Sequence, residues 1–526
     1  MKEVFRIDHW LFSLLCIMSV FSYSYKMTGT DIMPKWYFTT YVLLLGVFVI
    51  SIKLLIGGSF KINIFIASYI IIMICFIQAL YGIGQWFQWF PISDKYKITG
   101  SFNNSAGFAS CLCAGLPFVL LCLKLTVQKH IRLYSYLSVP IIIIAIVLSE
   151  SRAGVISIMA IWGIHLYKST PLKVYSKVIL FVFCFTLLLT GSYFYKKNSA
   201  DGRLLIWRCS WEMIKDAPLL GHGTGGFRAH YMDYQANYFK KHPNSKYAML
   251  ADNVITPFNE YLAVTLNWGL LGLCILLTLF FGFINCYRKE PTIERYTALL
   301  SLVAVSIFSM FSYPFKYPFI WIVICMDIYI ITKRKINIHT VYKKLLCISL
   351  ILFCFIAFYK LHRKVKAEYK WNKIAYKHPT NTILSHYATL IPILGENPFF
   401  LYNYAIALSD ANQLRKSLDV ALHCKRYWAD YDLVILLGNT YKKLKRYNDA
   451  EKYYQTASLM CPCRFVPLYL LFELYLEMEE KDKAHSTATL ISKKNIKVKS
   501  MTVMQIRYRI KKALENKETN KPYVKH

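Results

Sequence analysis

Hydrophobic residues along this chain cluster in long segments separated by short polar connections. Many of these segments approach 20 residues, the length that an α-helix needs to cross a hydrocarbon layer of about 30 Å. The pattern therefore predicts about eleven transmembrane helices, the sixth and tenth of them short. The expected spans are residues 10–23, 36–56, 62–81, 106–125, 133–148, 155–166, 178–193, 261–283, 296–311, 319–331 and 345–358.

Lysine and arginine gather in alternate short connections between the predicted spans. The positive-inside rule assigns such connections, and with them the N-terminus, to the cytoplasm. An odd number of spans then places the C-terminus outside, together with the long polar segment 195–252. Because basic connections account for much of the net charge of +34, this charge does not indicate a nucleic-acid partner. The basic residues are Lys53 and Lys61; Lys124, Lys129 and Arg132; Lys168, Lys173 and Lys177; Arg288, Lys289 and Arg295; and Lys333, Arg334, Lys335, Lys343 and Lys344.

Composition divides the chain into two domains. Hydrophobic residues make up 56% of it and charged residues 17%, against about 25% charged in soluble domains. The first span lacks a small-residue cleavage site, so no cleavable signal peptide is evident. Beyond residue 360 the chain becomes rich in Lys, Tyr, Glu and Asn. We expect an all-α fold with a polytopic membrane domain over 1–360 and a soluble helical domain over 361–526.

The C-terminal domain carries an internal repeat of about 34 residues. In segment 431–464, small and aromatic residues fall at the positions typical of a tetratricopeptide repeat, and segment 465–498 repeats the pattern. Each such unit is a helical hairpin that buries its apolar face by stacking on its neighbours. The predicted α-solenoid could recruit a protein partner, or it could be a spacer or a stabilising cap.

Metal-binding patterns are weak. Most of the 15 cysteines fall inside the predicted spans, where cysteine behaves as a small hydrophobe. The pair Cys461 and Cys463 has no second pair beside it. The histidines of the long polar segment, among them His222, His230 and His242, do not have zinc-ligand spacing. We therefore expect no metal site and no cofactor.

The polar segment 195–252 holds the densest chemistry. Asp201 caps a predicted helix on which Arg203, Trp207 and Trp211 recur at a spacing of four and so share a face. Tryptophan suits the membrane interface and also stacks on the apolar face of a sugar. The arginine fork matches the oxygens of a diphosphate, which makes Arg203 and Arg208 candidate anion ligands.

A glycine cluster, Gly221 to Gly226, follows that helix. It satisfies G-x-G-x-x-G, but no strand precedes it and no acidic residue closes a nucleotide-binding unit, so dinucleotide binding is rejected. A glycine turn into a helix can bind an anion through backbone N–H groups. It can equally be a flexible turn.

Two short polar clusters lie at the ends of predicted spans. Asn103 belongs to a turn of small polar residues that can cap the following helix. Arg152 lies in a very short outer hairpin, where it either snorkels beside Glu150 or faces a phosphate. Apart from Asp327, which has no obvious partner in the sequence, charged residues inside the spans are scarce, and this scarcity argues against an ion-coupled transporter.

Taken in chain order, these elements resemble the O-antigen ligase and polymerase superfamily. The resemblance covers roughly residues 60–330, and the repeats resemble those attached to some members. The matching elements are Gly-Ser-Phe-Asn-Asn at 100–104, Ser-Arg-Ala-Gly at 151–154, Arg203 with Trp207-Arg208, Pro-Leu-Leu-Gly-His-Gly at 218–223, Asn-Glu-Tyr-Leu at 259–262 and Asn-Trp-Gly-Leu-Leu-Gly at 267–272.

The resemblance implies a metal-independent glycosyltransferase on the periplasmic face of the bacterial inner membrane. The implied donor is a glycan on undecaprenyl diphosphate, and the acceptor is lipid A-core, another lipid-linked glycan or a protein. Arg152, Arg203 and Arg208 match the family arginines that hold the donor diphosphate. Trp207, Asn259 and Asn103 are the further expected substrate-binding residues.

One position departs from the family. Many ligases carry a histidine just before the Asn-x-Tyr-Leu element, and this chain has Phe258 there. Either Glu260 or His222 then serves as general base, or this branch needs none. The departure raises polymerase activity as an alternative to ligation.

Other functions stay open at this stage. Protein O-oligosaccharyltransferase activity is a third version of the same chemistry. A polysaccharide flippase and a membrane anchor that presents the repeats to a partner are the two readings without transfer chemistry.

Overall fold

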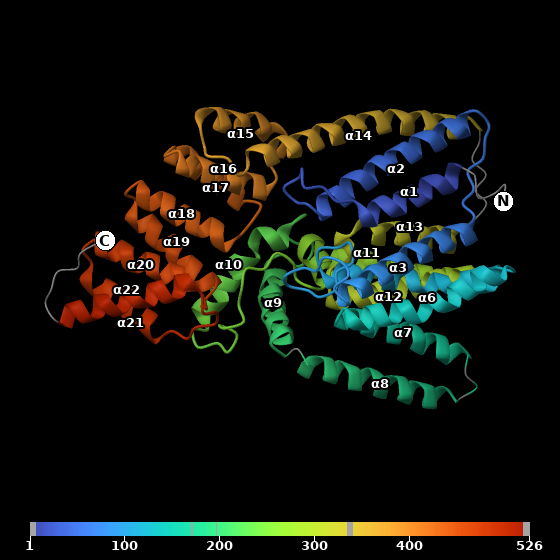
Figure 1. Ribbon diagram of the computed structural model, residues 1–526, viewed down its shortest axis with the longest axis horizontal. Coiled ribbons are helices and arrows are strands. Elements are labelled where there is room, and N and C mark those ends of the chain that lie inside the picture. The colour runs from blue at the N-terminus through green and yellow to red at the C-terminus, as the bar shows by residue number, and fades with distance from the viewer. Residues whose placement is uncertain (1–6, 170, 172, 196, 334–339, 519–526) are drawn as a thin grey trace. The chain divides into compact units, whose positions relative to one another are not determined.

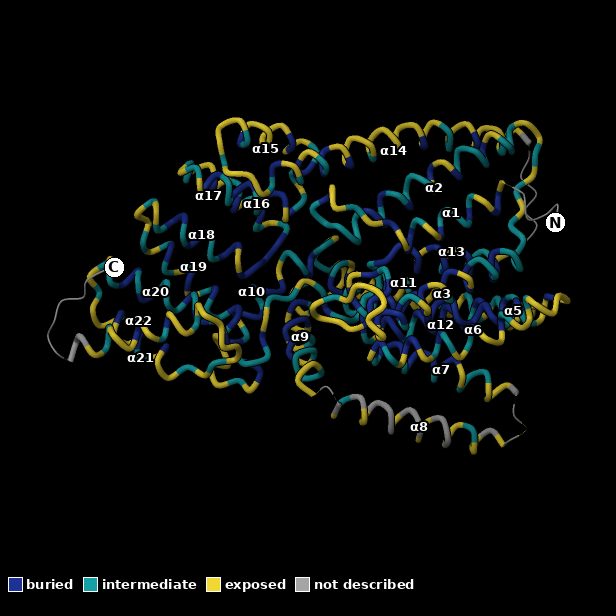
Figure 2. The backbone as a smooth tube through the Cα atoms, in the orientation of Figure 1, coloured by how far each residue is buried: buried dark blue, intermediate teal, exposed yellow. Residues whose placement is uncertain are grey.

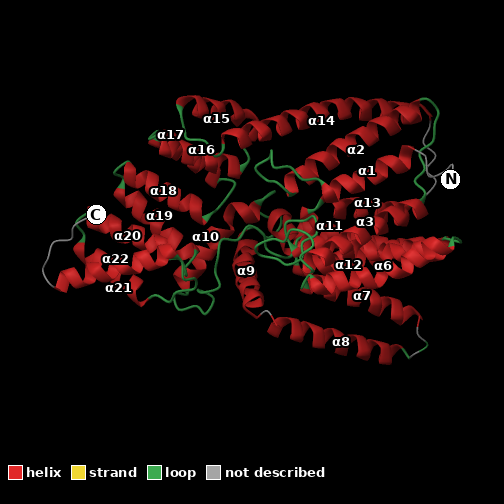
Figure 3. Cartoon of the chain, in the orientation of Figure 1, coloured by secondary structure: helices red, strands yellow, loops and turns green. Residues whose placement is uncertain are grey.

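The structure is a computed structural model that describes residues 7–169, 171, 173–195, 197–333 and 340–518. Every regular element in those residues is a helix (Figure 3), which confirms the all-α class. Contacts divide the chain into two compact units. The first, here called the membrane unit, comprises Met1–Tyr195, Phe258–Tyr261 and Cys274–Asn372; the second unit comprises Lys196–Pro257, Leu262–Leu273 and Lys373–His526.

The membrane unit contains the predicted spans, except that the span at 261–283 is divided, with Leu262–Leu273 in the second unit. A helix covers each of the expected segments (Figure 1). These helices are α1 (Ile7–Phe21), α2 (Ile32–Leu55), α3 (Ile64–Trp86), α4 (Ser105–Gly115) with η1 (Leu116–Phe118) and α5 (Val119–Leu125), α6 (Lys129–Leu148), α7 (Arg152–Ser169), α8 (Val174–Tyr195), α11 (Glu260–Lys289), α12 (Ile293–Phe311), η2 (Pro314–Lys316), α13 (Pro318–Thr332) and α14 (Thr340–Ile374).

Seven helices of the described residues are long and apolar enough to cross a membrane. α1 and α13 are apolar but shorter. The chain is therefore a multi-pass membrane protein, while the count of about eleven spans stays a prediction. α14 continues to Ile374, past the boundary expected at residue 360.

Burial within the membrane unit separates central from peripheral helices (Figure 2). In the most apolar 18-residue window of Ser105–Leu125, 83% of the residues are buried, against 6% in the corresponding window of Glu260–Lys289. The first therefore forms the core of the bundle, and the second offers its apolar side chains to lipid. Side chains of Asn63, Asn104 and Thr292 cap α3, α4 and α12, which sets where these helices begin.

The second unit combines the long polar segment with the C-terminal helices. From the polar segment it takes α9 (Lys197–Asp216) and α10 (Gly226–Lys241). The C-terminal helices are α15 (Asn381–Leu394), α16 (Pro398–Asp410), α17 (Leu414–Lys425), α18 (Tyr431–Lys443), α19 (Tyr447–Met460), α20 (Val466–Glu477), α21 (Lys481–Lys493) and α22 (Met501–Glu518).

The C-terminal helices pack in consecutive pairs. α16 packs on α17, α18 on α19 and α20 on α21, and each pair also contacts the next. Gly438 of α18 allows close packing, since a Cβ there would lie 2.5 Å from the Tyr454 ring of α19. Stacked helix pairs of this kind are what the repeat pattern led us to expect; that they are tetratricopeptide repeats stays a prediction.

Candidate functional site

The eight predicted site residues fall evenly into the two units. Asn103, Arg152, Asn259 and Glu260 belong to the membrane unit, and Arg203, Trp207, Arg208 and His222 belong to the second unit.

The glycine cluster pairs with a break in α11. The helix is interrupted at Gly269, which has φ 66° and ψ −168°. There the backbone N–H groups of His222 and Gly223 donate to the carbonyls of Leu266 and Asn267 at 2.8 and 2.9 Å. In return, the N–H groups of Leu270 and Leu271 donate to the carbonyls of Pro218 and Leu219. The two family-like elements at 218–223 and 267–272 therefore form one backbone-bonded substructure.

Glycine is required at this pairing for steric reasons. A Cβ on Gly221 would lie 2.6 Å from the backbone nitrogen of Gly269, and a Cβ on Gly269 would lie 2.0 Å from the carbonyl oxygen of Leu219. Both residues also have positive φ, which disfavours any side chain. Glycine at these two positions therefore allows the two backbone segments to approach closely. The N–H groups of His222 and Gly223 already donate to backbone carbonyls.

His222 is held by its own ring as well as by its backbone. Its Nε2 lies 2.8 Å from the carbonyl oxygen of Met213. Because a carbonyl only accepts, Nε2 carries the proton and Nδ1 is the only ring atom that can accept one. The His230 ring lies 5.5 Å away, and burial, followed by the charge of His222, lowers the pKa of His230. His222 thus has a structural role that the sequence did not reveal.

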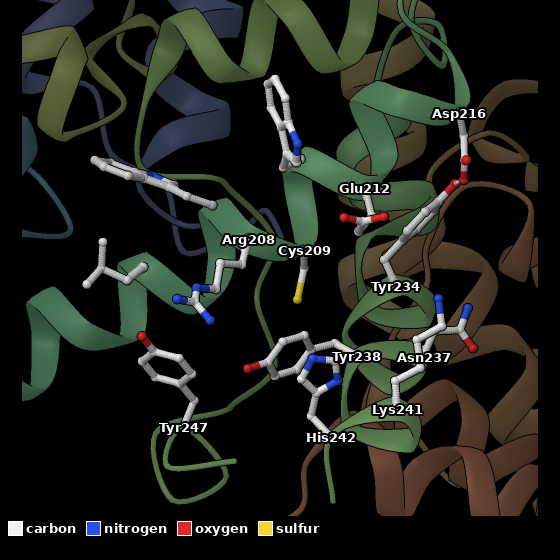
Figure 4. Close-up of a pocket in the computed structure, with 13 residues that line it drawn as sticks. Arg208, Cys209, Glu212, Asp216, Tyr234, Asn237, Tyr238, Lys241, His242 and Tyr247 are labelled. Atoms are coloured by element: carbon white, nitrogen blue, oxygen red, sulfur yellow. Dashed lines mark hydrogen bonds between the residues drawn. The ribbon is translucent and has the colours of Figure 1, made fainter.

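A cavity of about 760 Å³ opens between α9 and α10 of the second unit. Such a volume lies within the range of typical ligand sites. Arg208 projects from α9 toward the space bordered by Tyr238 and Tyr247 (Figure 4). The lining residues are Leu204, Trp207, Arg208, Cys209, Trp211, Glu212 and Asp216 from α9; Tyr234, Asn237, Tyr238 and Lys241 from α10; and His242 and Tyr247 beyond it.

Only some of the predicted residues of α9 line this cavity. Trp207 and Arg208 line it, whereas Arg203 is not among its lining residues. The indole N–H of Trp207 donates to the carbonyl of Pro257 at 3.3 Å, which fixes the ring. The Arg208 guanidinium lies 5.6 Å from the centre of the Tyr247 ring. The helical spacing placed Trp207 on a face that lines a cavity, but it did not predict that α10 supplies the opposite wall.

The acids of the cavity already have partners. Glu212 pairs with Lys215 at 2.9 Å, and Asp216 accepts a hydrogen bond from Tyr234 at 2.5 Å. Burial, with the bond and charge of Asp216, raises the pKa of Tyr234 to about 12, so its proton stays in place. In the part of the chain that the structure describes, neither Arg208 nor Lys241 pairs with a carboxylate. The cavity therefore offers aromatic faces and two cations to a ligand.

In the membrane unit, the Asn103 turn is bonded to the segment between α12 and α13. The Tyr317 hydroxyl lies 3.1 Å from Oδ1 of Asn103 and 3.0 Å from Oδ1 of Asn104. The side-chain amide of Asn104 also donates to the Tyr313 hydroxyl at 3.0 Å. Gly107 makes room for this contact, because a Cβ there would lie 2.5 Å from the Tyr317 ring.

Glu260 contacts the same segment. Its carboxylate accepts a hydrogen bond from the backbone N–H of Phe315 at 3.0 Å. Phe258, at the position where a histidine was expected, has φ 54° and packs its ring 5.5 Å from that of Tyr313. Positive φ in an aromatic residue is uncommon and marks local strain. The turn of Phe258 and Glu260 is thus tied to the segment around η2.

Lys316 adds a cation to this segment. Its ammonium lies 5.5 Å from the centre of the Tyr313 ring, and its carbonyl accepts a hydrogen bond from the Trp36 indole. Burial lowers the pKa of Lys316. Sequence reasoning treated Tyr313, Lys316 and Tyr317 as part of a connection between spans. The dense aromatic and proline content of 311–319 was the signal that could have singled them out.

Arg152 is the first residue of α7. Ser151, just before it, accepts a hydrogen bond from the Gly154 N–H at 3.3 Å. A Cβ on Gly154 would lie 3.2 Å from that of Ala109 in α4, so glycine lets the first turn of α7 approach the core. The turn that carries Arg152 is therefore firmly held.

Residues 137–277 match the family model described as O-antigen ligase. The match supports the O-antigen ligase superfamily, and with it a lipid-linked glycan donor and a membrane setting. It includes the cavity and both elements paired around Gly269, whereas Asn103 and the C-terminal helices lie outside it. No curated protein matches the chain.

No cluster in the described residues fits a metal ion. Within those residues, the structure brings together no group of three or more His, Cys, Asp or Glu side chains able to hold one.

Proposed function

We propose that this protein transfers a glycan from undecaprenyl diphosphate to an acceptor hydroxyl on the periplasmic face of the inner membrane, without a metal. In the reaction the acceptor oxygen attacks the anomeric carbon of the donor. The bond between that carbon and the diphosphate oxygen breaks, and undecaprenyl diphosphate leaves. The acceptor proton passes to a general base.

The observation that carries this proposal is the cavity between α9 and α10, inside the segment that matches O-antigen ligase. A leaving diphosphate gains negative charge, and preorganised cations stabilise it. Arg208, which has no carboxylate partner among the described residues, is suited to this role. Aromatic rings such as Trp207 and Tyr247 suit the apolar face of a sugar.

The remaining predicted residues keep their proposed roles. Arg152 and Arg203 are further cations for the donor diphosphate, and Asn103 and Asn259 are hydrogen-bonding residues for substrate. We assign the general base to Glu260, and His222, whose Nδ1 can still accept a proton while its Nε2–H donates to Met213, is the alternative base. The orientation follows from the positive-inside rule, with the N-terminus cytoplasmic and the polar segment periplasmic.

Polymerisation is the second candidate, and one observation favours it. Phe258 occupies the position where many ligases carry a histidine, and its ring is packed against Tyr313. A polymerase would add the donor glycan to another lipid-linked glycan. Ligation to lipid A-core and transfer to a protein hydroxyl differ from it only in the acceptor.

The test is the surface-glycan profile of cells in which the gene is deleted and then restored. Wild type, Arg208→Ala and Arg415→Ala would each be expressed, the last as a control because Arg415 is an exposed residue of α17. A ligase predicts lipopolysaccharide without its long glycan, restored by wild type and Arg415→Ala only. A single glycan unit left on the core indicates the polymerase, and loss of glycan from a protein indicates protein glycosylation.

Two outcomes would count against the proposal. Full restoration by Arg208→Ala would remove the role given to Arg208 and favour a membrane anchor, since an anchor does not need that cation. Lipid-linked glycan stranded on the cytoplasmic face of the deleted strain would identify a flippase.

A further inference from the structure

The helix that forms one wall of the cavity is bonded to the C-terminal helices. α10 packs along α19, within the second unit (Figure 1). Gln235, in the middle of α10, is fully buried. Its side-chain amide donates to the carbonyl of Met460 at 2.6 Å and to that of Asp252 at 3.1 Å, and its oxygen accepts from the Tyr231 hydroxyl at 2.7 Å.

Hydrogen bonds also connect the C-terminal helices to backbone carbonyls at the start of α10 and beyond its end. The N–H of Ala429, between α17 and α18, donates to the carbonyl of Arg228 in the first turn of α10 at 3.0 Å. The Cys463 thiol donates to the carbonyl of Ala251 at 3.4 Å, beyond the end of α10. Contacts to the C-terminal helices therefore extend from the start of α10 to the segment that follows it.

Two further side-chain contacts lie next to these. Asp430 caps α18 through one carboxylate oxygen and accepts from the side-chain amide of Asn253 through the other, at 2.5 Å. Arg464 pairs with Asp252 at 2.8 Å and stacks its guanidinium 4.3 Å from the centre of the Tyr431 ring. Burial raises the pKa of Asp252, but the bond and charge of Arg464 outweigh it and leave that pKa below its usual range.

Helix α10 presents one face to the cavity and another to the C-terminal helices. Tyr231 and Gln235, four residues apart, share the buried face. Tyr234, Tyr238 and Lys241 follow one another at helical spacing on the face that lines the cavity. A helix of about fifteen residues is only marginally stable in water by itself, so tertiary contacts decide where it lies. Here many of those contacts come from the C-terminal helices.

We infer that the C-terminal helical array acts in cis as a positioning element, which holds α10 so that the cavity keeps the shape its substrate needs. Gln235 is the central positioning residue, and Asp430 and Arg464 support it. The substrate in this inference rests on the proposed function, whereas the positioning of α10 by the C-terminal helices does not. It gives the array a task inside the protein, different from recruitment of a partner.

The first test is hydrogen–deuterium exchange on the purified full-length protein. Gln235→Glu keeps the shape of the side chain but removes the donor that faces the Met460 carbonyl. Gln505→Glu is the matched control, because Gln505 is exposed on α22. We expect exchange over 226–241 to rise about tenfold or more in Gln235→Glu, and to be unchanged in Gln505→Glu and in α3 of both variants. Unchanged exchange over 226–241 in Gln235→Glu would overturn the inference.

Transfer kinetics separate positioning from mere folding. With a lipid-linked glycan as donor, Gln235→Glu is expected to raise the donor KM more than it lowers kcat, since α10 lines the cavity. If activity falls only in proportion to the amount of folded protein, with KM and kcat unchanged, the array has a structural role alone and the inference fails. Because exchange is measured without any glycan, failure of the proposed function would leave the exchange result intact.

Reversing the ion pair between Asp252 and Arg464 provides a second test, at partly exposed side chains. Asp252→Arg and Arg464→Asp each remove the ion pair, and the double variant restores it in reverse. Partly exposed pairs contribute about 0.2–1 kcal/mol, so each single change should speed exchange over 226–241 by no more than about fivefold. Recovery in the double variant supports the inference. Additive losses in the double variant would contradict it, and this test decides alone if Gln235→Glu does not fold.

Discussion

Gly221 and Gly269 approach so closely that neither can carry a side chain. A Cβ on Gly221 would lie 2.6 Å from the backbone nitrogen of Gly269, and both residues have positive φ. They join the glycine cluster to the break in α11, and so unite two elements that are distant in sequence. The glycine cluster is therefore explained by backbone packing at these positions.

Replacing Gly269 by alanine should destabilise this pairing. Its φ and ψ lie in a region that is nearly exclusive to glycine, which costs about 1–3 kcal/mol for another residue, and the new Cβ would also clash with the Leu219 carbonyl. We expect a clear drop in the thermal unfolding temperature of the purified protein. Gly282→Ala in the same helix is the control, because nothing lies within 4 Å of a Cβ there. Equal unfolding temperatures for the two variants would contradict the role given to Gly269.

Lys241 should matter to substrate binding where its neighbour does not. Both lysines are exposed, but Lys241 lines the cavity and Lys240 does not. Loss of a charge-assisted hydrogen bond costs about 1.5–3 kcal/mol, so Lys241→Ala should raise the donor KM by about ten- to a hundredfold. Lys240→Ala should leave KM unchanged. Similar KM values for both variants would show that the donor does not reach Lys241.

Replacement by glutamine tells the two candidate bases apart. Glu260→Gln cannot accept the acceptor proton, so kcat should fall by about a hundredfold or more. His222→Gln can still donate to the Met213 carbonyl, and we expect near-normal kcat. The measurement is initial transfer rate at saturating donor. A loss of kcat in His222→Gln with full activity in Glu260→Gln would reverse the assignment.

Asp430 should make stability depend on pH. Burial raises the pKa of this carboxyl group, although hydrogen bonds from Asn253 and from the backbone oppose the rise. The folded state therefore holds the proton more tightly than the unfolded chain. The resulting stability is complete below the ordinary aspartate pKa of about 3.9 and is lost as the pH rises through the raised value.

Asp430→Asn removes this dependence while keeping the cap of α18. Its amide can face Asn253, whose own oxygen has no hydrogen-bond partner in the described structure. Unfolding temperatures of both proteins from acid to neutral pH would test this. The advantage of wild type over the variant should shrink as the pH rises. A constant difference would show that Asp430 does not titrate in this range.

Local patterns in the sequence were enough to predict the helices and some of the residues that line the cavity. Apolar length predicted the helices of the membrane unit, because each satisfies its backbone hydrogen bonds internally. Spacing of four placed Trp207 and Trp211 on one helix, and both line the cavity. The positions of Trp207 and Trp211 at the cavity therefore follow from a rule that depends only on neighbouring residues, whereas Arg208 was singled out by its guanidinium chemistry.

Contacts between segments that are distant in sequence could not be predicted from local patterns. Nothing in the sequence around Gln235 indicates a bond to Met460, and nothing around Glu260 indicates the N–H of Phe315. Such contacts depend on how helices pack, which helical periodicity does not determine. For the same reason the sequence left open whether the glycine cluster binds an anion, a question that its pairing with 266–271 now answers for His222 and Gly223.

The most direct test of the central claim is release of undecaprenyl diphosphate by the purified protein in liposomes. The vesicles would contain a lipid-linked glycan and a glycan acceptor, with wild type, Arg208→Ala and Arg415→Ala compared. Our account predicts that wild type and Arg415→Ala release undecaprenyl diphosphate as the acceptor grows, and that Arg208→Ala is at least about tenfold slower. Equal release by Arg208→Ala, or no release by wild type with each acceptor supplied, would contradict it.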